Sequence, residues 1–438
     1  MKLGKHLKVI NLLSLAALNF FHMSILAIFV TSFPLLQADF GVSNFELSLI
    51  STIYYSLSYF LQNIWINLAG KYSNGVVLIV GSLFWITPLL FIPFVTSYIQ
   101  VLIIVGLIGI GAQSIVVVIN NYFVSMEIKD NFAKTNSMLT IIQGAGGVFG
   151  TFFAASLQDM ANLPWTTPFL YIFVLSLIFL IVNLVFLHLI HKKNISINFI
   201  QEKYVFNFKT IKRLLKMKIN RLAIIIALLS IIPLTFLNIW TQVYFIHEHG
   251  VSQSIAMISF VFLSGAEFLG FLFGGYYFDY LKKNNKSNYR YFGFYGFSIA
   301  IVFFIIGLSI DWTLTHVPGD NFIELCINLF LAAIRDFRIA LFYISFFLAY
   351  FSYTFIEPYI FAILFFENKD DDRKMMINLA HTVITLSYLI GPVVGGVIAD
   401  AFGFTVMFFI VPMALFVSLI PLFLLGKSTG KQNGKNAV

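Results

Sequence analysis

Long apolar runs constrain what this chain can fold into. The sequence contains twelve runs of roughly 20 or more residues in which charged side chains are almost absent. A run of about 20 apolar residues is long enough to cross the hydrocarbon core of a bilayer as a helix. The pattern predicts an all-α integral membrane protein with twelve transmembrane helices. The expected spans are 10–34, 47–69, 76–94, 99–124, 135–158, 168–190, 222–246, 255–278, 291–311, 341–366, 376–399 and 404–426.

Composition excludes the main alternative classes. Hydrophobic residues make up 59% of the chain and charged residues 11%, whereas soluble domains carry about 25% charged residues. The formal charge of +8 would suggest nucleic-acid binding only if the basic residues shared one water-exposed domain. They are scattered over short loops, so we expect no nucleic-acid partner. Cys326 is the single cysteine, which rules out an intrachain disulfide.

The basic residues predict the orientation in the membrane. Nine Lys and Arg residues lie in the central stretch 191–221, and 25 of the 27 fall on one predicted side. Only Arg335 and Arg338 fall on the other side. Because Lys and Arg concentrate in cytoplasmic loops, we expect an inner-membrane protein with both termini in the cytoplasm. The predicted domains are an N-terminal six-helix bundle (1–190), a cytoplasmic basic linker (191–221) and a C-terminal six-helix bundle (222–438).

One further apolar segment, 322–334, is too short to count as a span. It contains thirteen residues, a length that suits an interfacial or re-entrant helix. If it crossed the membrane, every later loop would change sides, and the basic C-terminal tail would lie outside. We therefore expect a helix in a long outer loop, lying along the membrane.

Glycine-rich segments recur after the fourth and the tenth predicted spans, as expected for an internal repeat. The glycines are Gly144, Gly146, Gly147 and Gly150 in the first, and Gly391, Gly395 and Gly396 in the second. Small residues let helix backbones approach closely where lipid offers no hydrophobic driving force. We interpret these glycines as helix-packing positions rather than as ligand contacts.

Three short motifs resemble a known family. Gly275-Tyr-Tyr-Phe-Asp279-Tyr-Leu-Lys282-Lys283 resembles the inner-loop signature of the major facilitator superfamily. The equivalent place after the second span, Asn67-Leu-Ala-Gly70-Lys71, keeps part of that signature but has Gly70 where the family has Asp. The stretch 390–396 (IGPVVGG) is similar to the family's glycine-proline signature. Val105 stands where the family's proton-coupled antiporters carry Arg, which argues against a drug–proton antiporter.

The resemblance implies two pseudo-symmetric six-helix bundles that rock around a central cavity lined by the first, fourth, seventh and tenth spans. It also implies a conformational latch in the signature loop. A carboxylate at an inner helix end can cap a neighbouring helix and pair with a base. We therefore predict a latch formed by Asp279 with Lys282 or Lys283. The alternative for Asp279 is a solvated loop acid.

Two acidic residues, Glu267 and Glu357, lie at membrane depth in the eighth and tenth predicted spans. An ionised carboxylate there costs at least a few kcal/mol, so such residues are functional by default. A carboxyl group that binds and releases a proton as access alternates is the simplest coupling device. We predict that Glu357 or Glu267 is the proton-coupling site. The alternative is a neutral, hydrogen-bonded structural acid.

Other polar side chains recur at helical spacing within the predicted spans. Tyr350, Tyr353, Thr354 and Glu357 share one helix face, and Pro358 can kink that helix. Polar groups in hydrocarbon need partners and should point inward. Their role is either substrate binding or interhelical hydrogen bonding. The candidate substrate-binding residues are Asn19, His22, Gln113, Asn120, Asn238, Trp240, Gln242, Tyr350, Tyr353 and Thr354.

The residue types present favour a transporter over an enzyme. No Lys or Arg lies within a predicted span, which disfavours strongly anionic substrates unless His22 or an outer Arg provides the positive charge. The sequence has no nucleotide-phosphate loop, metal-ligand cluster or nucleophile constellation, so we expect no cofactor, no metal and no enzymatic activity. An integral-membrane enzyme would need such a constellation, and a membrane sensor would be expected to carry a sizeable soluble domain.

We therefore predict a monomeric secondary active transporter in the lipid bilayer. Its expected partners are a small neutral or cationic organic solute and a coupling proton or cation, moved in symport by alternating access. Efflux of hydrophobic or cationic compounds is the alternative within transport. A non-transporting membrane sensor or an integral-membrane enzyme is the alternative from another class.

Overall fold

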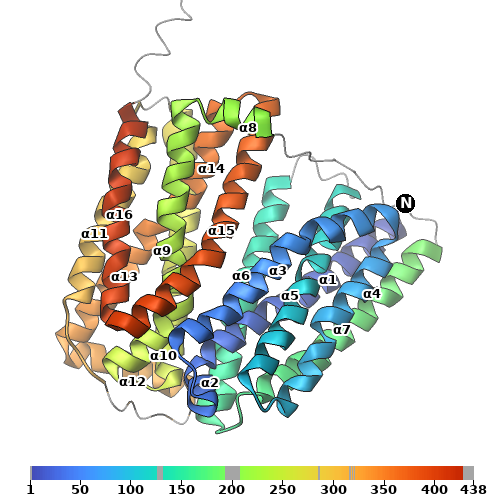
Figure 1. Ribbon diagram of the computed structural model, residues 1–438, viewed down its shortest axis with the longest axis horizontal. Helices are drawn as coiled ribbons and strands as arrows, with labels where there is room; N and C mark the ends of the chain where they lie inside the picture. The colour runs from blue at the N-terminus through green and yellow to red at the C-terminus, as the bar shows by residue number, and fades with distance from the viewer. Residues whose placement is uncertain are drawn as a thin grey trace, which may run out of the picture. The chain divides into compact units, whose positions relative to one another are not determined.

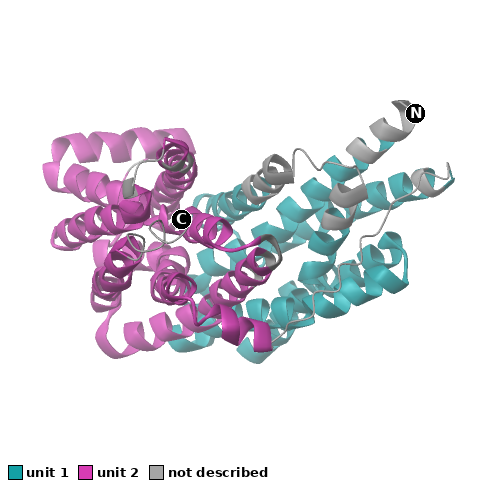
Figure 2. Cartoon of the chain, turned by 90° about the horizontal axis from the view of Figure 1, so that it is seen from above, with its two compact units in different colours: residues 1–203 teal, residues 204–438 magenta. Residues whose placement is uncertain are grey.

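The computed structural model describes residues 2–125, 132–192, 208–284, 287–314, 317, 319 and 321–427. Within these ranges the regular elements are helices, and no strand occurs. Contacts between residues divide the chain into two compact units, residues 1–203 and 204–438, which are coloured separately in Figure 2.

Unit 1 is organised around α1 and α5. α6 and α7 pack against α1, while α3 and α4 pack against α5 (Figure 1). Its helices are α1 (Lys2–Thr31), α2 (Phe33–Phe40), α3 (Asn44–Lys71), α4 (Asn74–Trp85), η1 (Thr87–Phe94), α5 (Tyr98–Ser125), α6 (Phe132–Ala155), η3 (Ser156–Met160) and α7 (Thr167–Lys192).

Unit 2 is organised around α9 and α13. α15 and α16 pack against α9, whereas α10 and α11 pack against α13 (Figure 1). Its helices are α8 (Phe208–Leu214), α9 (Lys218–His249), α10 (Gln253–Lys283), η4 (Ser287–Tyr291), α11 (Phe292–Leu308), α12 (Phe322–Arg335), α13 (Phe337–Tyr353), α14 (Ile356–Glu367), α15 (Asp370–Phe402) and α16 (Phe404–Lys427).

The helices are those of a membrane protein. Ten helical segments in the described ranges are long and apolar enough to cross a bilayer, and they correspond to ten of the twelve predicted spans. α3 and α6, with 28 and 24 residues, occupy the other two. Many large apolar side chains of these helices are exposed, such as Phe60 on α3 and Phe416 on α16. An aqueous surface would not tolerate so many, whereas lipid tails are a suitable solvent for them.

Local sequence explains where several helices begin and end. Ser43 and Glu46 form a capping box at the start of α3, in which each side chain accepts a hydrogen bond from the other residue's backbone N–H. Gly250 ends α9 with φ +65°, a left-handed conformation that glycine adopts without a steric penalty. The predicted kink near Pro358 is present, because α13 ends at Tyr353 and α14 begins at Ile356. Proline lacks a backbone N–H and clashes with the carbonyl four residues earlier, which is that of Thr354.

Some segments differ in detail from the expectations. Residues 208–221 of the predicted linker form α8 and the first turn of α9, while 193–207 lie outside the described residues. The short helix α2 was not predicted; Gly41 ends it with φ +64°. The third predicted span is not one continuous α-helix, because it changes from α-helix to 3-10 helix at Thr87, beside Pro88.

The glycines of α6 differ from one another in how closely they approach α1. A Cβ atom on Gly146 would collide with the backbone carbonyl of Phe20, and one on Gly150 would collide with that of Ser24. Gly144 and Gly147 have no neighbouring atom within 4 Å of such a Cβ. Gly146 and Gly150 are therefore the positions at which α6 requires glycine for close packing.

This difference provides a matched test of helix packing. We expect Gly150→Ala to destabilise the protein by about 1–3 kcal/mol, because its methyl group forces α6 away from α1. Gly147→Ala is the control and should be neutral or slightly stabilising, because alanine has the higher helix propensity. Thermal unfolding of the two purified variants checks the prediction. Equal unfolding midpoints would contradict it.

Candidate functional site

His22 is the centre of a buried polar cluster in unit 1. Its side chain is 1% exposed, and its Nε2 atom lies 3.3 Å from the hydroxyl of Tyr54 on α3. The indole of Trp85 on α4 meets the imidazole edge to face, with ring centres 5.1 Å apart. Nδ1 of His22 and Nε1 of Trp85 have no hydrogen-bond partner among the described residues. Buried polar atoms without partners mark places where a bound molecule or water can donate or accept.

Asn19 lies on the same face of α1 as His22. Asn19 precedes His22 by one helical turn, is fully buried, and neither of its amide atoms has a partner among the described residues. Gln113 on α5 is half-buried. The side chain of Asn120 lies outside the described residues, so its predicted role stays a prediction.

In unit 2 the predicted polar face of the tenth span divides between two neighbouring helices. The hydroxyl of Tyr350 lies 2.7 Å from Oγ1 of Thr241 on α9, and the hydroxyl of Tyr353 donates to the carbonyl of Ser230 on the same helix. Thr354 points to α10 instead. Its hydroxyl is 3.1 Å from the backbone carbonyl of Glu267.

The two membrane-depth acids lie in the same part of unit 2. Glu267 on α10 and Glu357 on α14 are close enough for their charges to interact. Oε1 of Glu267 is buried and has no hydrogen-bond partner among the described residues. Tyr350 and Tyr353 also lie within electrostatic range of Glu267. Helical spacing in the sequence predicted that Glu357 shares a face with Tyr350 and Tyr353. In the structure Glu267 interacts electrostatically with all three of these residues.

The three candidates on α9 have different surroundings. Gln242 is 3% exposed, and its Oε1 atom has no partner among the described residues. Asn238, one turn earlier, is half-buried. Trp240 is fully buried, donates from Nε1 to the carbonyl of Pro392 at 3.4 Å, and its ring contacts Phe404. Trp240 therefore bridges α9 to α15 and α16, whereas Gln242 retains an unused acceptor.

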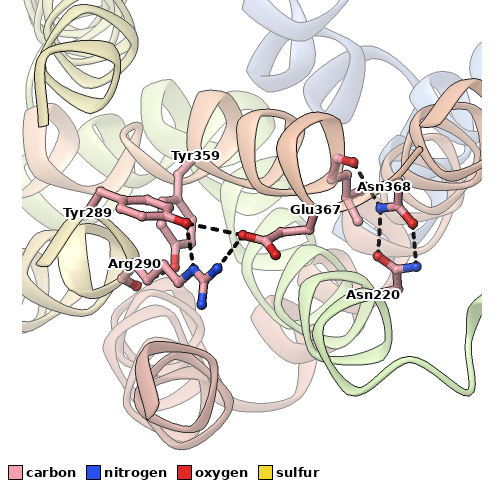
Figure 3. A network of polar contacts seen from close by, with 7 residues as sticks. Asn220, Tyr289, Arg290, Tyr359, Glu367 and Asn368 are labelled. Carbon is pink, nitrogen blue, oxygen red and sulfur yellow. Dashed lines mark hydrogen bonds and ion pairs between the residues drawn. The ribbon is translucent and has the colours of Figure 1, made fainter. Parts of the chain in front are cut away.

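A second polar network lies at the end of unit 2 that contains α8. Arg290, next to the start of α11, forms an ion pair of 2.5 Å with Glu367 at the end of α14 (Figure 3). The two side chains are only 12% and 13% exposed. The hydroxyl of Tyr289 donates to Glu367 at 3.1 Å, and Tyr359 donates to the backbone carbonyl of Arg290 at 2.5 Å. The pair therefore connects α11 to α14.

Neighbouring amides extend this network to α9. Asn220 and Asn368 exchange two hydrogen bonds of 2.8 Å between their side chains (Figure 3). Asn220 also donates to the carbonyl of Leu214 on α8. Arg213 on α8 pairs with Asp372 at the start of α15, at 2.6 Å. The first turn of α9 and the short helix α8 are thus connected to α14 and α15.

The predicted latch residues lie at the C-terminal end of α10. The side chains of Asp279 and Lys282 lie outside the described residues, and Lys283 is exposed. The latch therefore stays a prediction. Sequence reasoning did not find the Arg290–Glu367 pair, because 77 residues separate its members. The available signal was that both residues flank loops on the predicted cytoplasmic side.

Comparison with known proteins identifies the family. The family model of the Major Facilitator Superfamily matches residues 15–318. The chain belongs to the major facilitator superfamily. It is accordingly a multi-pass membrane protein with the all-α fold of this transporter family.

Solved structures share the fold at low sequence identity. The crystal structure of the nucleoside transporter NupG is similar with a TM-score of 0.70 and 13% identity, covering 98% of this chain and 100% of that one. The bacterial homologue of the human lysosomal transporter Spinster, in an inward-facing and occupied conformation, is similar with a TM-score of 0.67 and 14% identity, covering 95% and 94%. A search of curated protein sequences finds no match for this chain.

The Arg290–Glu367 pair should contribute to stability in a way that a double-mutant cycle can measure. We expect Arg290→Met to destabilise the protein by roughly 3 kcal/mol, because it leaves a mostly buried carboxylate without its cation. Adding Glu367→Met should restore part of this loss, because two apolar side chains replace two charges. Thermal and denaturant unfolding of the purified variants provide the measurement.

The control is an exposed ion pair in the same unit. Arg338 and Asp336 form a pair of 2.7 Å in which the side chains are 66% and 33% exposed. Breaking it with Arg338→Met should cost less than about 1 kcal/mol, since water screens exposed pairs. Equal losses for Arg290→Met and Arg338→Met would contradict a structural role for the buried pair.

Proposed function

We propose that this chain is a proton-coupled secondary active transporter that moves a small neutral or cationic organic solute in symport by alternating access. The observation that supports it most is the pair of membrane-depth acids, Glu267 and Glu357, within electrostatic range of each other. No Lys or Arg lies in any of the twelve predicted spans, so the sequence places no permanently charged cation at the membrane depth of these acids. Two carboxylates in a medium of low dielectric repel each other strongly, and a bound proton relieves the repulsion.

In the proposed mechanism the pair Glu267 and Glu357 binds and releases the coupling proton. The neutral pair is compatible with an apolar environment, and the ionised pair requires water. Proton binding from one side and release to the other would therefore favour different conformations of the protein. Thr354 donates to the backbone carbonyl of Glu267, and this contact supports a fixed position for α10 beside α13.

The substrate would bind through unused hydrogen-bonding atoms. Asn19 and His22 in unit 1 and Gln242 in unit 2 are buried and have atoms without partners among the described residues. A solute with donors and acceptors would satisfy these atoms at little desolvation cost. The lack of Lys and Arg on every predicted span supports a neutral or cationic solute rather than an anionic one. We also propose a monomer in the inner membrane, with the α8 end of unit 2 and both termini in the cytoplasm; the distribution of Lys and Arg supports this orientation.

Transport by the purified protein tests the function directly. Proteoliposomes with an imposed pH gradient should accumulate one or more members of a panel of neutral and cationic metabolites, and collapse of the gradient should abolish accumulation. Failure of the gradient to change uptake of any transported compound would overturn proton coupling. Movement of a compound in the direction opposite to proton flow would replace symport by proton-driven efflux.

Substitution of the acid pair should remove coupling without removing binding. We expect Glu357→Gln and Glu267→Gln to keep substrate exchange across the membrane and to lose acceleration by the pH gradient, because glutamine cannot bind and release the proton. Glu324→Gln, which changes an exposed acid on α12, is the control and should leave the gradient dependence unchanged. Unchanged dependence in both Glu267 and Glu357 variants would refute their role.

Gln242 provides a separate test of substrate binding. We expect Gln242→Leu to raise the apparent KM about tenfold, because one hydrogen bond to the solute is lost. Gln158, whose amide donates to the Ser32 hydroxyl at 2.7 Å, serves as the matched control. Gln158→Leu should lower the unfolding temperature but leave KM unchanged. An unchanged KM for Gln242→Leu together with a raised KM for Gln158→Leu would show that Gln242 does not bind the substrate.

A further inference from the structure

α12 presents three distinct faces. Leu325 and Leu329 are 5% and 8% exposed and lie on the side that packs against α10 and α13. A second face carries the charged residues Glu324 and Arg335, both exposed. The third face is a row of exposed apolar side chains at spacings of four, three and four residues, which lie along one side of a helix. Its members are Ile323, Ile327, Phe330 and Ile334, with exposed fractions of 68%, 53%, 66% and 64%.

The position of α12 in the chain restricts what can cover this row. α12 follows the spanning helix α11 and is joined to the spanning helix α13 by the single residue Asp336. Its 14 residues give a length of about 21 Å, which is shorter than the hydrocarbon core of about 30 Å. The segment α13–α14 runs from Phe337 to Glu367, so α12 lies at the end of it opposite the Arg290–Glu367 network.

The helices that pack against α12 also expose apolar side chains. Phe337 and Ile344 on α13 and Phe262 on α10 are exposed apolar side chains of spanning helices that adjoin α12. The charged residues on and next to α12 in the sequence are Asp320, Glu324 and Asp336 against Arg335 and Arg338, so the segment carries no net positive charge. A surface of this kind binds a bilayer through its apolar area, with little contribution from anionic headgroups.

We propose that α12 is an interfacial helix, with the row Ile323, Ile327, Phe330 and Ile334 immersed at the boundary between headgroups and acyl chains of one leaflet. The helix lies along the membrane plane and neither enters nor crosses the core. Asp336 caps α13 by accepting a hydrogen bond of 2.9 Å from the backbone N–H of Arg338. Because the connection is one residue long, α12 fixes the depth of that end of α13, the helix that carries Tyr350 and Tyr353.

Spin labels can measure this placement in the full-length protein. Replacement of the single native cysteine, Cys326→Ser, gives a background for one label at a time. Labels at Ile323→Cys, Ile327→Cys, Phe330→Cys and Ile334→Cys are compared with control labels at Glu324→Cys and Arg335→Cys, all in neutral phosphatidylcholine liposomes. Accessibility to oxygen, which is soluble in lipid, and to a water-soluble nickel chelate gives the depth of each label.

We expect the four row positions to favour oxygen at one common depth, roughly 5–10 Å below the headgroup boundary, and the two controls to favour the nickel chelate. Adding anionic lipid or salt should leave these depths unchanged. Nickel access at the row would overturn the proposal, because the row would then lie in water. Low access of both reagents at the row would overturn it in favour of a second protein surface. A steady increase in depth from Ile323 to Ile334 would indicate a helix that enters the core.

A measurement without substitutions guards against misfolded variants. The unmodified protein in the same liposomes is labelled with a lipid-soluble carbene reagent and, separately, with hydroxyl radicals in water, and the sites are identified by mass spectrometry. Carbene labelling of Ile327 and Phe330 together with their protection from hydroxyl radicals is the expected result. Hydroxyl-radical labelling of Phe330 at the level of exposed loop residues would overturn the proposal.

Discussion

Hydrocarbon provides no hydrogen-bond partner, and most of this structure follows from that constraint. A helix satisfies most backbone groups of a span internally, and the polar side chains must find their partners in the protein. Many do so: Ser14 donates to Asn183 at 2.8 Å, and Ser259 and Tyr343 share a hydrogen bond of 2.5 Å. Polar side chains that keep unpaired atoms, such as Asn19 and Gln242, are costly and therefore stand out as candidates for function.

The arrangement around Glu267 shows how packing positions a costly group. A Cβ atom at Gly270 would collide with the carbonyl of Phe351 and the hydroxyl of Thr354. Glycine there allows α10 and α13 to touch, and only at this separation can Thr354 donate to the carbonyl of Glu267. A few residues after Thr354 the chain reaches Pro358, and the helix breaks before it. Glu357 therefore belongs to the next helix, α14, rather than to α13. Two local sequence features, a glycine and a proline, thus control the placement of both acids.

Sequence patterns predicted the helices well and the contacts poorly. Runs of apolar residues are a local property, so ten predicted spans have counterparts of suitable length and apolarity. Spacing along one helix placed Tyr350, Tyr353 and Thr354 on a common face, but it could not show that Tyr350 contacts α9 while Thr354 contacts α10. Likewise, 32 residues separate His22 from Tyr54. Contacts of this kind depend on how helices pack, which a single sequence does not encode in any local pattern.

The contrast between two kinds of glutamate explains why one is suited to structure and the other to coupling. Glu367 lies at a helix end with Arg290 at 2.5 Å, and the cation neutralises it without any proton exchange. Glu267 has a second acid, Glu357, within electrostatic range, and no predicted span carries a Lys or Arg. A proton, a coupling cation or a cationic solute can then compensate its charge within the membrane. The counter-charge, rather than the residue type, therefore decides which carboxyl groups could respond to a proton gradient.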